Sequence, residues 1–144
     1  MPTPKFDLGR AAIATIPARC FWDEEFKLFT PDGNGVVDAD TVPANYTQLA
    51  ATDEVRFRLF DGDDTVAIIV ADDQNPSGNG TTVTIDDKGD GSTVPARVTV
   101  KFAATDLNIA PKDYGFVIDI KDVSDGNRYQ PACFGTIRIV ASPT

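Results

Sequence analysis

The chain has 144 residues, of which 42% are hydrophobic and 24% are charged, and its formal net charge is −9. This length suits one domain with a core of its own, and the composition excludes bulk disorder. The negative charge disfavours nucleic acid as a partner because it repels phosphates, and the absence of histidine excludes any site that needs an imidazole base.

The first 52 residues are predicted to form an extended N-terminal arm and an irregular loop region. Prolines at positions 2 and 4 favour an extended start, and Ala11 to Ile16 is a short strand candidate that ends at Pro17. The densest aromatic cluster follows, and we interpret it as a partner-binding anchor, with packing inside its own domain as the open alternative. Its members are Phe21, Trp22, Phe26 and Phe29.

Oxygen-bearing side chains at alternating positions follow the next turn, and their spacing is similar to the start of a calcium loop. The pattern departs from that of an EF-hand, because Val36 occupies the fifth position and Pro43 the twelfth, where a bidentate Glu is expected. A plain turn is therefore preferred, and a calcium-dependent module is a weaker alternative. The candidate ligands are Asp32, Asn34, Asp38 and Asp40.

From Asp53 onward the sequence alternates with the period of half-buried strands. Val55, Phe57 and Leu59 are the apolar positions of the first such strand. The run from Val66 to Val70 is continuously apolar, which is typical of a strand covered on both faces. The alternation recurs in four later segments: Thr82 to Ile85, Val98 to Phe102, Tyr114 to Ile120 and Phe134 to Val140.

Turns between these segments are rich in glycine and aspartate. Two acidic clusters are interpreted as hairpin tips whose side chains bond to the backbone, in preference to metal ligands. Residues 103–108 are typical of a single helical turn that crosses one end of the domain. The acidic clusters are Asp61, Asp63 and Asp64, and Asp86, Asp87 and Asp90.

Seven to nine short strands separated by such turns predict an all-β fold, an immunoglobulin-like or Greek-key β-sandwich with an extended N-terminal arm. The sandwich is predicted to span residues 53–144, and residues 1–52 are treated as an extension of the same domain. We expect removal of residues 1–29 to leave the sandwich folded.

The two cysteines, Cys20 and Cys133, lie near opposite ends of the chain. No signal-peptide pattern precedes them, which predicts synthesis in the cytoplasm and reduced thiols. Free thiols are therefore preferred, and a disulfide between neighbouring terminal strands is the alternative. No glycine-rich phosphate-binding or dinucleotide-binding motif is present, so no cofactor is expected, and no apolar run is long enough to span a membrane.

The predicted sandwich resembles a recurrent phage module, the immunoglobulin-like domain at the N-terminus of baseplate upper proteins and related virion proteins. The segments that support the resemblance are Thr105-Asp106-Leu107, then Pro111, then Tyr114 at the start of an alternating strand. Residues 1–52 do not match this pattern. The resemblance implies a structural role in a virion and brings no catalytic residues with it.

We therefore expect a non-enzymatic virion protein, a capsid decoration or a tail or baseplate adaptor that docks on other virion proteins through its N-terminal arm. It is expected to form a homo-oligomer or to join a lattice, without nucleic acid or membrane partners. Paired carboxylates for glycoside hydrolysis are not expected, because the acids lie in turns beside glycine. The alternative is a carbohydrate- or cell-surface-binding sandwich, which would expose aromatic residues beside a groove. Its candidates are Trp22, Tyr46, Tyr114 and Tyr129.

Overall fold

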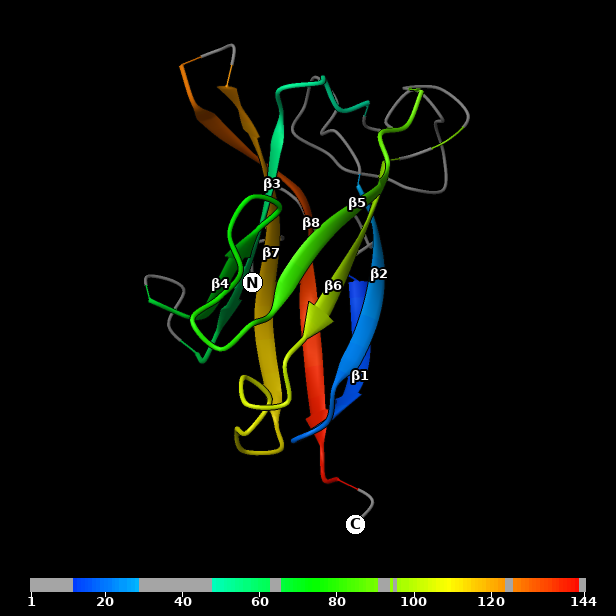
Figure 1. The fold of residues 1–144 in the computed structure, drawn as a ribbon. Helices are drawn as coiled ribbons and strands as arrows, with labels where there is room; N and C mark the ends of the chain where they lie inside the picture. Colours follow the sequence, from blue (N-terminus) through cyan, green and yellow to red (C-terminus); the bar gives the residue numbers. More distant parts are fainter. Residues whose placement is uncertain are drawn as a thin grey trace, which may run out of the picture.

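The computed structural model describes residues 12–28, 48–62, 66–90, 94, 96–123 and 126–142. In these residues two β-sheets pack face to face, which confirms the predicted all-β sandwich (Figure 1). The five-stranded sheet has the order β1 (Ala12–Pro17), β8 (Arg128–Val140), β7 (Asp113–Asp122), β3 (Glu54–Phe60) and β4 (Ala67–Asp72). The three-stranded sheet has the order β2 (Trp22–Leu28), β6 (Ala96–Phe102) and β5 (Thr82–Asp87).

The strand order is that of an immunoglobulin-like sandwich. Strands β1 and β8 run parallel, and every other pair in the two sheets is antiparallel. The chain changes sheet four times, between β1 and β2, between β2 and β3, between β4 and β5, and between β6 and β7. Such crossings give the Greek-key connection of this fold and place β7 at the centre of the larger sheet.

Aromatic rings join the two sheets at the centre of the core. Phe26 of β2 lies 5.0 Å from Phe116 of β7, measured between ring centroids. Phe57 of β3 stacks on Phe116 at 6.1 Å and meets Phe102 of β6 edge-on at 5.3 Å. Antibody domains place a disulfide between strands B and F, which correspond in order to β2 and β7, and a tryptophan on strand C, which corresponds to β3. Here phenylalanine rings fill that space, and they stabilise it by burial and aromatic contact.

The entry to β7 is a tyrosine corner. The Tyr114 hydroxyl donates a hydrogen bond to the carbonyl of Ala110, four residues earlier, at 2.7 Å. The predicted single helical turn lies just before this corner. The Leu107 amide donates a hydrogen bond to the carbonyl of Ala103 at 3.2 Å, and the Leu107 side chain is fully buried. This corner is a hallmark of immunoglobulin-like domains, and here it fixes the path of the chain between the sheets.

The expected N-terminal arm is wrong for residues 12–28. β1 pairs with β8 from Ala12 to Pro17, and β2 pairs with β6 along its whole length. Ile16 and Leu28 are fully buried, so these strands complete the core. The short strand candidate that ends at Pro17 is confirmed by β1 from Ala12 onward. The prolines and the aromatic cluster suggested an arm around it, because the two buried residues of β2 are too few to show a strand period. Removal of residues 1–29 would delete two strands of the sandwich.

Two other strands differ from their predictions. The run Val66 to Val70 was expected to be covered on both faces, but β4 is an edge strand on which Ile68 and Val70 are exposed. The last strand begins at Arg128, six residues before the predicted start. Pro131 is tolerated there because the β7–β8 register shifts at this point and because β1 pairs with β8 only from Gly135 onward.

Both cysteines have free thiols, which confirms the interpretation preferred from the sequence. Cys133 lies in the first half of β8, whereas the Cys20 sulfur lies 3.9 Å from the hydroxyl of Ser142, just beyond the other end of that strand. Nine residues of extended chain at about 3.3 Å each separate the two positions, so they cannot form a disulfide.

Candidate interaction surface

Side chains on the solvent side of β3, β7 and β8 form the surface that we name the outer face: Arg58, Phe60, Val117, Asp119 and Phe134. The strand period of two directs these residues away from the core, while their neighbours Phe57, Leu59, Phe116 and Ile118 point inward and are buried. The register places Arg58 beside Val117, and Val117 beside Phe134. Charged and apolar groups are therefore direct neighbours on this face.

A hollow of about 480 Å³ lies in the outer face. Its lining consists of the five residues of that face, Phe116, Pro131 and three glycines, Gly62, Gly115 and Gly135. The glycines contribute no side chain, which explains why the sheet is recessed here. A Cβ atom built at Gly115 would meet no atom within 4 Å. The hollow is therefore open space above the backbone, with an apolar floor and an ionic rim.

At the rim of the hollow the Asp119 carboxylate lies between two guanidinium groups, of which Arg58 lines the hollow and Arg56 does not. Arg56 and Arg58 each donate a hydrogen bond from Nη2 to Oδ2 of Asp119 at 2.7 Å. The Asp119 side chain is 2% exposed, whereas those of Arg56 and Arg58 are 21% and 28% exposed. Arg56 also lies over the ring of Tyr129, 3.7 Å from its centroid. This packing desolvates the ion pairs and holds the group rigid.

The group has an excess of one positive charge. Burying a carboxylate requires compensation by hydrogen bonds and opposite charge, and Asp119 has both. Arg58 is less well satisfied, because its Nε is buried without a hydrogen-bond partner. The hollow is therefore bordered by a guanidinium with spare donor capacity beside a compensated carboxylate, while Arg56 lies between Asp119 and Asp72 in the strand register.

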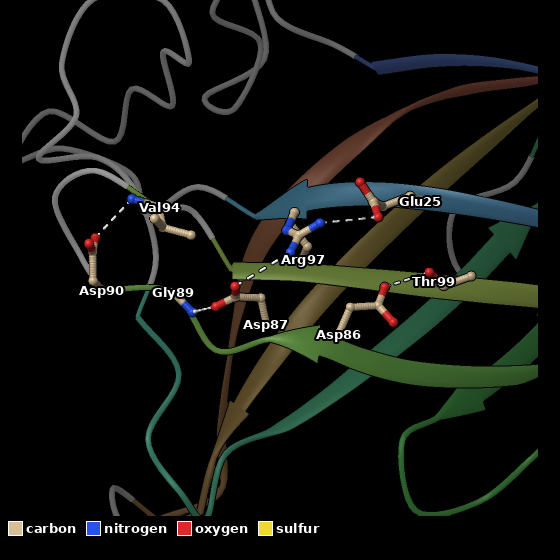
Figure 2. Close-up of polar contacts among 8 residues, drawn as sticks. All are labelled: Glu25, Asp86, Asp87, Gly89, Asp90, Val94, Arg97 and Thr99. Carbon is tan, nitrogen blue, oxygen red and sulfur yellow. Dashed lines mark hydrogen bonds and ion pairs between the residues drawn. The ribbon is translucent and has the colours of Figure 1, made fainter.

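The outer surface of the three-stranded sheet is polar throughout, and Figure 2 shows part of it. Arg97 of β6 reaches Glu25 of β2 and Asp87 of β5 on either side, at 3.5 and 3.4 Å. Two aspartates bond to the backbone as predicted for a hairpin tip, Asp87 to the Gly89 amide and Asp90 to the Val94 amide. This surface resembles ordinary solvated protein surface.

A buried carboxylate that sequence reasoning missed ties two loops together at one end of the sandwich. Asp106 accepts hydrogen bonds from the hydroxyls of Ser77 and Thr81 and from the Asn79 side-chain amide. Thr81 in turn accepts a bond from the Ala103 amide at 3.0 Å. Every polar contact is internal, so this cluster is structural. The Ser-Gly-Asn-Gly-Thr turn was recognised only as a turn, because its distant partner is not visible in the sequence.

The predicted aromatic anchor does not form one surface in the structure. Phe26 is a core residue, so its assignment to a partner surface is corrected, and the alternative of packing inside its own domain applies to it. Phe21 is 81% exposed, and Trp22 is 37% exposed and donates from Nε1 to Glu24 at 3.0 Å. Phe29 lies outside the described residues.

The four calcium candidates, Asp32, Asn34, Asp38 and Asp40, also lie outside the described residues, as do Asp63 and Asp64. Among the residues that the structure describes, no group of three or more His, Cys, Asp or Glu side chains could hold a metal ion. Asp61 of the second acidic cluster pairs with Lys112. No helix in the described part is long and apolar enough to cross a membrane.

Comparison with known proteins does not assign the chain to a group. No protein-family model matches the sequence, and no curated protein is similar to it.

Proposed function

We propose that this chain is a non-enzymatic structural protein of a phage virion, a capsid decoration or a tail or baseplate adaptor, that docks through the outer face of its five-stranded sheet. The observation that supports docking is the hollow, whose apolar floor borders the Arg58 guanidinium and its ion pair with Asp119. The virion setting rests on the resemblance of residues 53–144 to phage immunoglobulin-like modules.

The chemistry of the hollow defines its occupant. Phe60, Val117 and Phe134 offer apolar contact, and Arg58 offers guanidinium donors at the rim. A neighbouring virion protein that inserts an apolar side chain beside a carboxylate complements both features, and central pockets of this kind dominate the energy of protein interfaces. The outer face thus takes the docking role that the sequence had suggested for the N-terminal arm.

The carbohydrate-binding alternative gains no specific support from the described residues. Trp22 lies on β2 and Tyr129 on β8, in different sheets, and Tyr114 is buried at its corner. These aromatic residues therefore do not flank a common groove. Tyr46 lies outside the described residues.

The virion setting is tested on particles purified from the phage whose genome encodes this chain. Quantitative mass spectrometry should find the protein in a fixed ratio to the major capsid or tail protein after density-gradient purification. Immunogold labelling should then place it on head or tail. Its absence from purified particles would overturn the virion proposal.

Docking through the outer face is tested by filling the hollow. Gly115→Leu places a side chain in open space at a position that requires no left-handed backbone, so the variant should fold normally. We expect its binding to particles that lack the protein to weaken at least tenfold. Gly78→Leu is the matched control, because that glycine is also open and lies in a loop away from the hollow. Unchanged binding of Gly115→Leu would exclude the outer face.

A further inference from the structure

The hollow of the outer face lies beside the point at which the chain enters the described part of the sandwich. β1 begins at Ala12, and the register sets Ala12 beside Gly135 of β8, which lines the hollow. β1 runs parallel to β8, so the chain before Ala12 approaches from the side of Phe134 and Pro131, which also line the hollow. Residues 1–11 precede this point and lie outside the described residues. The chain therefore brings a segment of its own to the edge of this surface.

The outer face has apolar residues where a sandwich normally has polar ones. Positions that point away from the core of an antiparallel sheet usually contact water. Here Phe60, Val117 and Phe134 occupy such positions around the hollow. Phe60 is only 6% exposed, although it points away from the core. Apolar groups from a covering segment would complete this surface.

Three consecutive residues of the preceding segment have the chemistry that the hollow complements: Phe6, Asp7 and Leu8. They place a carboxylate between two apolar side chains, while the hollow places a guanidinium beside an apolar floor. Arg58 has donor capacity to spare, because its Nε has no hydrogen-bond partner in the described part of the chain. Hydrogen bonds between a guanidinium and a carboxylate are about twice as strong as neutral ones.

The charge of the segment also favours contact with the rest of the molecule. Lys5 and Arg10 outnumber the one acid of residues 1–11, Asp7, so the segment is basic. The whole chain has a net charge of −9. Opposite charges attract, so the segment is drawn towards the sandwich and not repelled from it.

The hollow is within reach of this segment. Neighbouring strands lie about 4.8 Å apart, so Val117 on β7 is about 10 Å from β1 across β8. An extended chain spans about 3.3 Å per residue, so the stretch from Ala12 back to Leu8 covers up to about 13 Å. Gly9 lies in this stretch and allows a change of direction. The β7–β8 register shifts beside Pro131, which makes β8 a poor edge along which to continue β1.

We propose that residues 6–8 lie across the outer face of their own chain and fill the hollow, with Phe6 and Leu8 on its apolar floor and Asp7 paired with the Arg58 guanidinium. A short tether keeps the segment at an effective concentration of about 1 mM near the hollow. A segment with a Kd of about 0.1 mM for the hollow then covers it in about 90% of the molecules. The same chain is therefore favoured as the occupant over a second copy at micromolar concentration.

The covering segment has a consequence for docking, and this consequence rests on the proposed function, whereas the covering itself does not. A partner that docks in the hollow has to displace the segment first. Deletion of residues 1–11 leaves β1 complete and should strengthen binding to particles that lack the protein about tenfold, because apparent affinity follows the open fraction. A deletion variant that binds no more tightly than the full chain would contradict this gating. Particles that bind neither chain would overturn the docking role alone.

A tryptophan in place of Phe6 tests the covering in the free protein. The single native tryptophan is first replaced, so the double variant Phe6→Trp/Trp22→Phe has one emitter. We expect its emission to be blue-shifted and its quenching by acrylamide to be at least about threefold weaker than in the urea-unfolded chain, because the open fraction is minor. Adding Gly115→Leu fills the hollow and should restore strong quenching, whereas Gly78→Leu should not. Circular dichroism should confirm that all variants are folded.

Two results would overturn the proposal. One is equally strong quenching of the reporter tryptophan with and without Gly115→Leu. The other is protection that appears only as the protein concentration rises from about 1 μM to about 1 mM, because an intramolecular contact does not depend on concentration. That result would assign the segment in the hollow to a second copy.

The contact of Asp7 with Arg58 is tested separately from the apolar contacts. In the reporter chain Asp7→Asn should increase quenching, because it removes the charge that the guanidinium binds. Asp7→Glu should keep most of the protection, because it retains the carboxylate. Equal quenching in both variants would contradict the ion pair.

The place of Leu8 is tested by disulfide formation in a Cys20→Ser background. Leu8→Cys with Val117→Cys should form an intramolecular disulfide in glutathione buffer, with an effective concentration at least tenfold above that of Leu8→Cys with Thr84→Cys. Thr84 is the matched control, because it is exposed on β5 of the other sheet. Equal effective concentrations for the two pairs would contradict the placement of the segment over β7.

Discussion

At the scale of single residues, the sandwich depends on a few side chains whose roles follow from burial. Phe116 contacts both Phe26 and Phe57, so one ring connects the second, third and seventh strands. Tyr114, two residues earlier on the same strand, is 3% exposed and bonds to the Ala110 carbonyl. The ring contacts of Phe116 thus fix the side chains of the central strand of the large sheet, and the Tyr114 hydrogen bond fixes the backbone that leads into it.

Tyr114→Phe should destabilise the fold by about 1 kcal/mol, the usual net value of one hydrogen bond. In a chain of this length that corresponds to a fall of about 3 °C in melting temperature, measured by calorimetry. Tyr129→Phe is the control, because that tyrosine is 46% exposed and its ring can stay on Arg56. An equal loss in both variants would argue against the corner.

The same tyrosine predicts an alkaline transition. Burial raises the pKa of the Tyr114 phenol above its ordinary value near 10. The protonated phenol therefore contributes stability that is complete below about pH 10 and is lost as the pH rises through the folded-state pKa, because the unfolded chain gives up its proton first. Ultraviolet titration should show one tyrosine ionising later than the others in wild type, and Tyr114→Phe should abolish that late step.

At the scale of elements, β1 is the clearest test of whether the N-terminal region belongs to the fold. Ile16→Ala should cost about 3 kcal/mol, since the side chain is fully buried and its loss leaves a cavity. Thr15→Ala, one residue earlier on the exposed side, should change stability by less than about 0.5 kcal/mol. Urea unfolding measures both values. Equal, small effects would mean that β1 does not pack on the core in solution.

The elements also show what sequence patterns can and cannot predict. Alternation identified the inward residues Val55, Phe57 and Leu59, because the strand period alone decides which face a residue occupies. It could not identify the neighbours of a strand. The apolar run at β4 was therefore interpreted as a central strand, although apolar residues at an unpartnered edge give the same pattern.

The candidate interaction surface could not be predicted from the sequence for the same reason. Asp119 was predicted as a residue of an alternating strand, but its contacts with Arg56 and Arg58 depend on β3 lying beside β7. These residues are more than 60 positions apart in the sequence. Two glycines on neighbouring strands, Gly115 and Gly135, line the hollow, and both lie in segments that were expected to be plain strands.

At the scale of the whole molecule, the surface divides into faces of different character. The three-stranded sheet is covered by charged and hydroxyl side chains, while the five-stranded sheet has a partly apolar hollow beside the ion pairs of Asp119 and exposes Ile68 and Val70 on β4. An overall charge of −9 keeps copies apart in general. Docking is therefore proposed on the larger sheet, where apolar groups interrupt the charged surface.

The two free thiols allow the opening of the whole sandwich to be measured without a label. Burial raises the pKa of the Cys133 thiol to about 12, so its reactive thiolate is scarce, and its position between the sheets excludes reagents. Cys20 lies in the partly exposed connection between β1 and β2. Ellman's reagent should therefore modify one thiol per native chain quickly and the second only after global opening.

Three outcomes define this last prediction. In denaturant without reductant, two thiols per chain should react, as expected for unpaired cysteines. In Cys20→Ser the fast phase should disappear, and the slow phase should accelerate in Ile16→Ala in proportion to its lost stability. The reason is that Ile16 and Cys133 belong to the same hydrophobic core, and β1, which holds Ile16, pairs with β8, which holds Cys133. A loss of stability at Ile16 therefore makes the opening that exposes Cys133 more frequent. Fast native modification of Cys133 would show that this end of β8 opens independently of the rest of the sandwich.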